Sequence, residues 1–190
     1  ATYAREGCAA GATVTIVASD KDLMQLVSDC VVMYDTMKDK KIGVPEVIEK
    51  FGVPPEKVIE VQALIGDTVD NVPGVPGIGV KTAAQLINEY GDLDTLLARA
   101  GEIKQPKRRE SLEQNAELIR ISKKLVSLRD DVPAPATPDQ FEKKKPDANV
   151  LLPWLEQQGF KSLLTRFQKE LGEGEDGAGE WPPGKVGEGA

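Results

Sequence analysis

The feature that most constrains this chain is a run rich in glycine and proline at residues 66–90, GDTVDNVPGVPGIGVKTAAQLINEY. Three glycines open its backbone: Gly74, Gly77 and Gly79. Lys81 and Thr82 follow them, where apolar residues begin to recur at helical spacing. Backbone amides at such a helix start bind anions, and a DNA phosphate is one candidate. The run predicts a helix-hairpin-helix element, with an ordinary tight turn between two helices as the alternative.

Two pairs of aspartates are candidate site residues. Asp67 and Asp70 stand three residues apart, so a helical turn would bring both onto one face. Asp20 and Asp22 follow residues 13–18, TVTIVA, which predict a strand buried on both faces. Open α/β sheets place ligands at the carboxyl ends of strands. Taken alone, the position is better explained by Ser19 or Asp20 capping a helix over residues 21–27.

The absence of histidine narrows the possible chemistry. It removes Ser/His/Asp and Cys/His triads and most zinc sites. Carboxylates alone favour hard cations such as Mg²⁺ or Mn²⁺, and two converging pairs would suit phosphodiester hydrolysis. Cys8 and Cys30 lack CxxC spacing, and we interpret them as buried or unreactive thiols.

Charge and hydropathy give weaker signals. The net charge is −7, but acidic residues gather in the Gly-, Glu- and Pro-rich segment 172–190, which predicts a flexible linker. Basic clusters lie at residues 104–109, 120–124 and 143–145, and each taken alone is better explained by a solvated face than by DNA contact. No run of about 18 apolar residues predicts a membrane span, and no secretory signal is visible, so we expect a cytoplasmic location.

The remaining pattern is mostly helical. Residues 1–11 predict a helix that lacks a capping residue, which suggests that sequence before it is missing. A strand is expected at 30–34, a turn at 35–41 and a loop at 132–138. Further helices are expected at 45–51, 54–65, 93–100, 106–124, 147–158 and 160–171. The last two are expected to pack around a core of Trp154, Leu155, Phe160, Leu163, Leu164 and Phe167.

Two segments carry a family resemblance: TIVASDKDLMQLVSD at 15–29 and LIGDTVDNVPGVPGIGVKTAAQLINEYG at 64–91. In this order they resemble the 5'-3' exonuclease domain of bacterial DNA polymerase I, within the flap endonuclease family, and the likeness covers residues 1–171. The resemblance implies that the acids of DKD and GDxxDN are catalytic metal ligands, directly or through water: Asp20, Asp22, Asp67 and Asp70. It also implies DNA contact by Gly74, Gly77, Gly79, Lys81 and Thr82, with a monovalent cation such as K⁺ held by carbonyls of the hairpin.

The implied fold is α/β and predominantly helical, the remnant of a parallel sheet followed by a helix-hairpin-helix region. Residues 1–43 would be the catalytic portion, 44–171 the DNA-binding region with the hairpin at 66–90, and 172–190 a linker towards a proofreading or polymerase region. The implied substrate is a 5' flap or nicked duplex. Further acids and a helical arch of the family precede the first residue here, so this chain alone is expected to cleave weakly or not at all.

Two other functions fit the same residues. A non-catalytic helix-hairpin-helix module would bind duplex DNA and use the acids as caps and surface charge. A structural domain of a larger enzyme would make no DNA contact at all. Divalent-ion binding separates the first alternative from a nuclease, and salt-dependent DNA binding separates the second.

Overall fold

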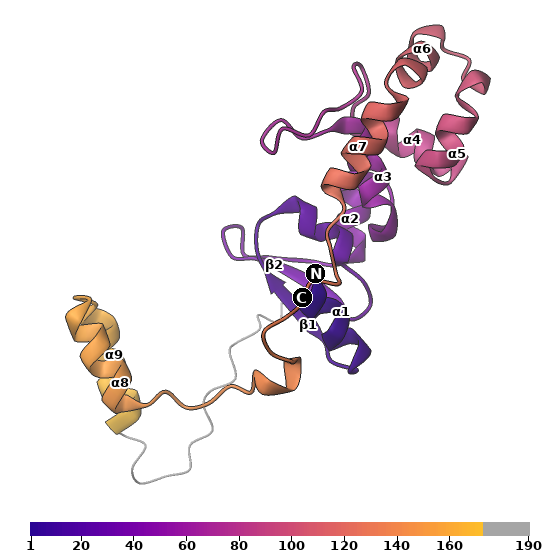
Figure 1. Cartoon of the computed structure of the whole chain (residues 1–190). Helices are drawn as coiled ribbons and strands as arrows, with labels where there is room; N and C mark the ends of the chain where they lie inside the picture. Colours follow the sequence, from indigo (N-terminus) through magenta and orange to yellow (C-terminus); the bar gives the residue numbers. More distant parts are fainter. Residues whose placement is uncertain (173–190) are drawn as a thin grey trace. The chain divides into compact units, whose positions relative to one another are not determined.

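A computed structural model describes residues 1–172 of the chain (Figure 1). Its residues form two compact units, Ala1–Gln140 and the chain from Phe141 onward. The predicted acidic linker lies, from residue 173, outside the described residues. Within 1–172, no helix is both long and apolar enough to cross a membrane.

The first unit starts with helix α1 (Thr2–Ala9) and a three-stranded sheet in the order β1-β2-β3. Strands β1 (Val14–Val17) and β2 (Val31–Asp35) pair in parallel, and β3 (Lys40–Ile42) pairs antiparallel to β2. The expectation that the first strand is buried on both faces is wrong, because its burial alternates and Val17 is 64% exposed. The 3₁₀ helix η1 (Lys21–Leu26) joins β1 to β2, where an α-helix was expected.

The rest of this unit is helical, as the sequence pattern predicts. Its elements are α2 (Val44–Phe51), η2 (Pro55–Lys57), α3 (Val58–Ile65), α4 (Val80–Tyr90), α5 (Leu93–Ala98), η3 (Ala100–Glu102), α6 (Pro106–Gln114), α7 (Ala116–Val126) and η4 (Pro138–Gln140). The single helix expected over 106–124 breaks at Asn115, whose side chain donates to the Ser111 carbonyl at 2.7 Å. Asparagine competes with the helix backbone in this way.

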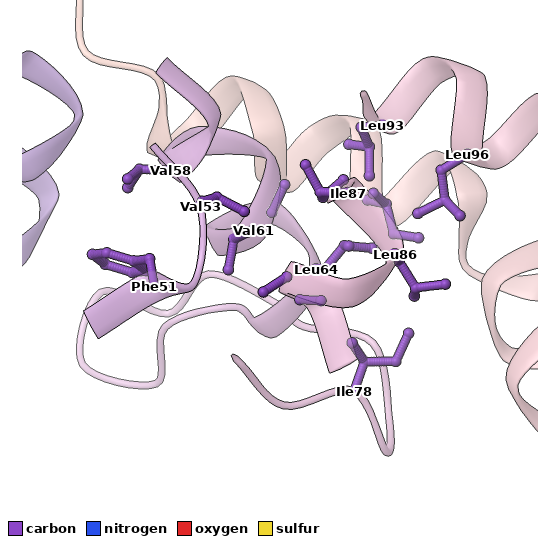
Figure 2. Close-up of a cluster of buried hydrophobic side chains, with 14 of the residues drawn as sticks. Phe51, Val53, Val58, Val61, Leu64, Ile78, Leu86, Ile87, Leu93 and Leu96 are labelled. Carbon is purple, nitrogen blue, oxygen red and sulfur yellow. The ribbon is translucent and has the colours of Figure 1, made fainter. Parts of the chain in front are cut away.

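One apolar core joins the sheet to the helices. It contains Met33 and Ile42 of the strands together with the apolar faces of α2, α3, α4 and α5. Figure 2 shows part of this core, with ten of its buried side chains labelled: Phe51, Val53, Val58, Val61, Leu64, Ile78, Leu86, Ile87, Leu93 and Leu96. Ile78 comes from the loop before α4, so burial of this side chain anchors the glycine-rich turn to the core.

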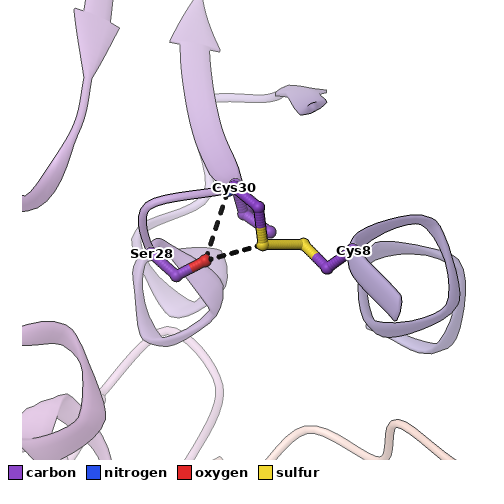
Figure 3. The surroundings of a disulfide bond; sticks show 4 residues. Cys8, Ser28 and Cys30 are labelled. Carbon is purple, nitrogen blue, oxygen red and sulfur yellow. Dashed lines mark hydrogen bonds between the residues drawn. A yellow bond between two sulfur atoms is a disulfide. The ribbon is translucent and has the colours of Figure 1, made fainter. Parts of the chain in front are cut away.

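A disulfide joins Cys8 of α1 to Cys30, just before β2 (Figure 3). Ser28 supports the bridge: its hydroxyl lies 3.3 Å from the Cys30 sulfur and accepts from the Val31 amide at 3.2 Å. The interpretation of the two cysteines as unreactive thiols is therefore wrong. Their spacing of 22 residues carries no pairing signal, and only the packing of α1 beside β1 brings the two sulfurs together.

Breaking the disulfide is expected to lower the free energy of unfolding by about 3 kcal/mol, because the unfolded chain regains the entropy of a loop closed over 22 residues. Urea unfolding of the oxidised protein, with and without dithiothreitol, measures the difference. The Cys8→Ser variant should have the same free energy of unfolding as the reduced protein, and dithiothreitol should not lower it further. Coincident curves for oxidised and reduced protein would contradict the prediction.

The second unit contains α8 (Ala148–Gln157) and α9 (Lys161–Gly172). The predicted core of this helix pair is wrong in most of its members. Leu155 is buried, but Trp154 is 50% exposed and Phe160 is 46% exposed. The two rings still lie 6.0 Å apart between centroids. Two short helices have too little apolar surface to enclose side chains of this size.

Candidate functional site

Three of the four predicted aspartates come together. Asp22 lies in η1, and Asp67 and Asp70 lie in the loop after α3. One carboxylate oxygen from each lies within 4.8 Å of the other two. Asp67 is buried, Asp22 is half-buried and Asp70 is exposed, so the cluster opens to solvent on one side. Two segments about 45 residues apart in sequence thus build one acidic site.

The turn that carries Asp67 and Asp70 is not helical, so the expectation of a shared helix face is wrong. Helix α3 ends at Ile65, and Asp67 and Val72 then exchange both backbone hydrogen bonds, at 2.8 and 2.7 Å. The Asp67 carboxylate accepts from the Val69 amide at 2.8 Å. This closed loop, rather than a helical turn, brings the two carboxylates to one side.

Asp20 lies outside the cluster. Its carboxylate accepts from the Asp22 amide at 2.9 Å and caps η1. The sequence allowed this capping role as an alternative, and the structure confirms it. A role for Asp20 in metal binding stays a prediction.

Two neighbours of the cluster were missed from the sequence. The Lys21 ammonium lies 2.5 Å from a carboxylate oxygen of Asp67. The Gln62 side-chain amide, on α3, donates to Asp22. Gln62 is only 2% exposed, and its amide oxygen has no hydrogen-bond partner among the described residues. The one available signal was a polar residue at a buried position between Val61 and Ala63.

The surroundings of two of the carboxylates shift their pKa values in opposite directions. Burial raises the pKa of Asp22, although the hydrogen bond from Gln62 partly offsets this. The hydrogen bond from Lys21 holds the pKa of Asp67 below its usual value, helped by the Val69 amide. The same contact raises the pKa of Lys21. The site therefore already stabilises one positive charge beside Asp67, and its carboxylate oxygens are the ligands that hard divalent cations prefer.

The glycines of the hairpin have different surroundings. A β-carbon on Gly74 would lie 2.2 Å from the Ile65 carbonyl oxygen, so this glycine is explained by close packing inside the loop. A β-carbon on Gly77 or Gly79 would meet nothing within 4 Å. Gly77 has φ +79° and Gly79 precedes the first residue of α4. Gly77 and Gly79 therefore leave the backbone open to an approaching group, and contact of the three glycines with DNA stays a prediction.

Helices α6 and α7 hold the hairpin in place. Ser111 of α6 donates to the Pro76 carbonyl at 3.2 Å, and Ser122 of α7 donates to the Pro73 carbonyl at 2.6 Å. These bonds fix a loop that packing of Val75 and Ile78 already anchors. The turn is therefore held in one conformation, which suits contact with the regularly spaced phosphates of a DNA backbone.

The start of α4 presents the remaining predicted residues. Lys81 is exposed and Thr82 is half-buried in the first turn of the helix. Lys81 forms no ion pair with any residue in the described part of the chain. The first amides of a helix have no partner within it, so the turn, Lys81 and Thr82 together form a candidate anion site.

The sequence profile of a family described as "5'-3' exonuclease, C-terminal SAM fold" matches residues 53–149, just over half of the chain. The chain belongs to this 5'-3' exonuclease family. The match covers the acidic turn, the hairpin and helices α4 to α7, and it confirms the family resemblance seen in the sequence.

Curated relatives in the 5'-3' exonuclease family extend the match. The chain is 60% identical over 166 residues to DNA polymerase I of Rhizobium leguminosarum, covering 87% of this chain and 16% of the relative. It is 38% identical over 159 residues to the 5'-3' exonuclease of Aquifex aeolicus, covering 84% of this chain and 54% of the relative. The chain therefore spans only part of each of these proteins.

A solved structure has the same fold. The T5 5'-exonuclease with bound divalent metal ions, zinc in that crystal, matches with a TM-score of 0.60 and 25% sequence identity. The match covers 65% of this chain and 47% of the T5 protein. It confirms the predicted fold class, a small sheet followed by a larger helical region.

Proposed function

We propose that this chain is part of a structure-specific 5' nuclease that hydrolyses DNA phosphodiesters with divalent metal, as the 5'-3' exonuclease region of a DNA polymerase I. The observation that carries the proposal is the meeting of Asp22, Asp67 and Asp70 within 4.8 Å, where Asp67 and Asp70 belong to the loop that continues into the hairpin. The polymerase and exonuclease relatives support the substrate class. Action on DNA would take place in the bacterial cytoplasm, at the nucleoid.

In this proposal Asp22, Asp67 and Asp70 hold Mg²⁺ or Mn²⁺, and Asp20 contributes directly or through water. When bound, the divalent cation supplies an activated water and offsets negative charge on the phosphate. The bound metal ions of the T5 relative support this cofactor class. Gln62 keeps the Asp22 carboxylate oriented by its hydrogen bond, and the closed loop from residue 67 to 72 keeps Asp67 and Asp70 side by side.

The proposed DNA contacts are Gly77, Gly79, Lys81 and Thr82, with Gly74 shaping the loop behind them. Backbone amides and one lysine would meet phosphates of a 5'-flap or nicked duplex without reading its sequence. Carbonyls of the hairpin would hold a monovalent cation such as K⁺. In functional terms residues 1–43 would belong to the catalytic portion, 44–171 to DNA binding, and 172–190 to a linker towards a proofreading or polymerase region.

The test measures binding of a labelled 5'-flap duplex by fluorescence anisotropy across a KCl series. We expect affinity to fall steeply with salt, by a slope of about −0.9 per phosphate contacted. Lys81→Ala should weaken binding and lower the slope by about 1. Lys41→Ala, an exposed lysine of β3, serves as the matched control and should change neither quantity.

Two results would overturn the proposal. Binding that does not depend on salt would rule out the proposed contacts with duplex phosphates and would favour a purely structural domain. Salt-dependent binding by a chain that shows no affinity for Mg²⁺ or Mn²⁺ would favour a non-catalytic helix-hairpin-helix module. The proposal requires both salt-dependent duplex binding and a divalent-cation site.

A further inference from the structure

Lys21 places a positive charge inside the acidic site. It is the first residue of η1, directly before Asp22, and its ammonium lies 2.5 Å from the Oδ2 oxygen of Asp67. The charges of Asp22 and Asp70 also attract this ammonium. Lys21 is therefore drawn to the same three carboxylates that would hold a divalent cation.

The two carboxylate oxygens of Asp67 have different partners. Oδ1 accepts from the Val69 amide at 2.8 Å and from the Asp70 amide at 3.4 Å, and these bonds shape the turn. Oδ2 faces Lys21, so it is the oxygen through which Asp67 would bind a cation. Protein oxygens lie about 2.0–2.6 Å from a bound Mg²⁺ or Ca²⁺, which is close to the distance between Oδ2 and the ammonium. The ammonium and a divalent cation would therefore compete for one oxygen.

Only one member of this ion pair is free to move away. The Lys21 side chain is 39% exposed, whereas the Asp67 side chain is 5% exposed and is held by its turn. A divalent cation and an ammonium within about 4 Å of each other repel where water is partly excluded, so both cannot stay at Oδ2. The lysine can turn towards solvent. Its backbone keeps the displaced ammonium nearby, at an effective concentration in roughly the millimolar range.

A second lysine–aspartate pair lies outside the acidic site. Asp35, at the end of β2, is also buried, and the Lys38 ammonium lies 3.4 Å from its carboxylate. Asp35 accepts from the Ser19 hydroxyl at 2.8 Å and from the Met37 amide at 3.0 Å. Among the described residues, the group of three acids that could hold a metal does not include Asp35. Lys38 therefore neutralises a single buried carboxylate, whereas Lys21 contacts one member of a cluster of three.

We propose that Lys21 is an internal competitor of the divalent cation for Oδ2 of Asp67. The inference rests on the proposed function, because it takes the acidic cluster to be a divalent-cation site. Before the cation binds, the ammonium offsets repulsion among the three carboxylates and stabilises the loop that carries Asp67. When the cation binds, the ammonium leaves Oδ2. Lys21 thereby raises the cation concentration at which the site fills.

The test measures Mn²⁺ binding in the absence of DNA, from the electron paramagnetic resonance signal of free Mn²⁺ at constant ionic strength. Lys21→Met should bind Mn²⁺ about tenfold more tightly than the wild type, because the competing charge is gone. Lys21→Arg retains the charge and should stay within about threefold of the wild type. Lys38→Met removes the lysine of the other buried pair and should change Mn²⁺ affinity by less than about twofold. Unchanged or weaker binding by folded Lys21→Met would overturn the inference.

A double variant separates competition at Asp67 from a general effect of charge. If Lys21 acts through Oδ2, its removal should gain nothing once that carboxylate is replaced. Lys21→Met/Asp67→Asn should then bind Mn²⁺ no more than about twofold more tightly than Asp67→Asn alone. A tenfold gain in both backgrounds would show that the lysine acts only through its field, and would overturn competition for Oδ2.

Thermal unfolding gives an independent readout. In EDTA, Lys21→Met should unfold about 4 °C below the wild type, because Asp67 stays buried beside like charges without its ammonium. Saturating Mg²⁺ should remove this difference, since the cation replaces the ammonium. Lys38→Met should also be destabilised, but Mg²⁺ should not restore it. A deficit in Lys21→Met that Mg²⁺ leaves unchanged would contradict the exchange. Should Lys21→Met fail to fold in EDTA, Lys21→Gln, which is neutral but can still donate to Asp67, applies the same tests.

Failure of this inference can be told apart from failure of the proposed function. Mn²⁺ binding by the wild type that Lys21→Met leaves unchanged would overturn the competitor role and leave the divalent-cation site intact. No Mn²⁺ or Mg²⁺ binding by either the wild type or Lys21→Met would overturn the proposed function itself, and the inference with it.

Discussion

Asp67→Asn is expected to weaken binding of Mg²⁺ or Mn²⁺ by roughly 100-fold or more, since loss even of outer-shell partners costs about 10- to 100-fold. Asp67 is 7% exposed and lies at the centre of the acidic site, within 4.8 Å of oxygens from Asp22 and Asp70. Asparagine retains an oxygen that can accept from the Val69 amide, so the closed loop should persist. Isothermal titration with each cation, in the absence of DNA, measures the effect independently of any cleavage.

Two matched variants sharpen this experiment. Asp29→Asn removes an exposed aspartate beside the disulfide and should leave cation affinity unchanged. Asp20→Asn keeps a good helix cap and removes a charge outside the cluster, so it should weaken cation binding by about tenfold, less than Asp67→Asn does. Unchanged affinity in Asp67→Asn, with the variant folded, would mean that the three carboxylates are surface charge rather than a metal site.

Local chemistry made the hairpin and most helices predictable. Gly77, with φ +79°, stands where the chain must turn, and Gly52, with φ +71°, ends α2. Pro45 lies in the first turn of α2, where its fixed backbone angle is favourable. These features depend on single residues and their neighbours. They can therefore be inferred without knowing how the chain packs.

The parts that could not be predicted depend on contacts between distant segments. Gln62 lies 40 residues from Asp22, and nothing in the sequence pairs them. Likewise, Cys8 and Cys30 meet only because α1 packs beside the sheet. The aromatic residues Trp154 and Phe160 were expected to be buried from their chemistry alone, yet they stay half exposed on their helix pair. Apolar composition indicates what can be buried, but the amount of surrounding structure decides what is.

The acidic site was predictable in its sequence signature but not in its geometry. Its loop has a local signature, GDTVDN, and its family match was visible from the sequence. Its geometry was not, because Asp67 and Asp70 are joined by a bridged turn that a spacing of three residues does not distinguish from a helix. The residue that makes this turn possible is Gly66, and it provides the sharpest test of how loop geometry supports the site.

Gly66→Ala is expected to lower the free energy of unfolding by about 4 kcal/mol, from backbone strain and overpacking together. Gly66 has φ +70°, and an added β-carbon would lie 2.4 Å from the Gly74 nitrogen and 2.6 Å from the Val72 carbonyl oxygen. Both contacts are backbone atoms, so neither can rotate away as a side chain would, and the Val72 carbonyl is held in addition by the Asp67 amide. Urea unfolding monitored by circular dichroism measures the loss.

Two further glycines separate the causes of that loss. Gly77→Ala imposes the same left-handed backbone, at φ +79°, but its β-carbon meets nothing within 4 Å, so it should cost only about 1 kcal/mol. Gly101→Ala has neither problem and should stay within about 0.5 kcal/mol. A loss at Gly66 no larger than that at Gly77 would contradict the close packing of residues 65, 66 and 74. The expected order of losses, Gly66 above Gly77 above Gly101, links the stability of the fold to the packing that holds Asp67 and Asp70 beside Asp22. Because Gly66→Ala disturbs that packing, this variant should also bind divalent cations more weakly than the other two.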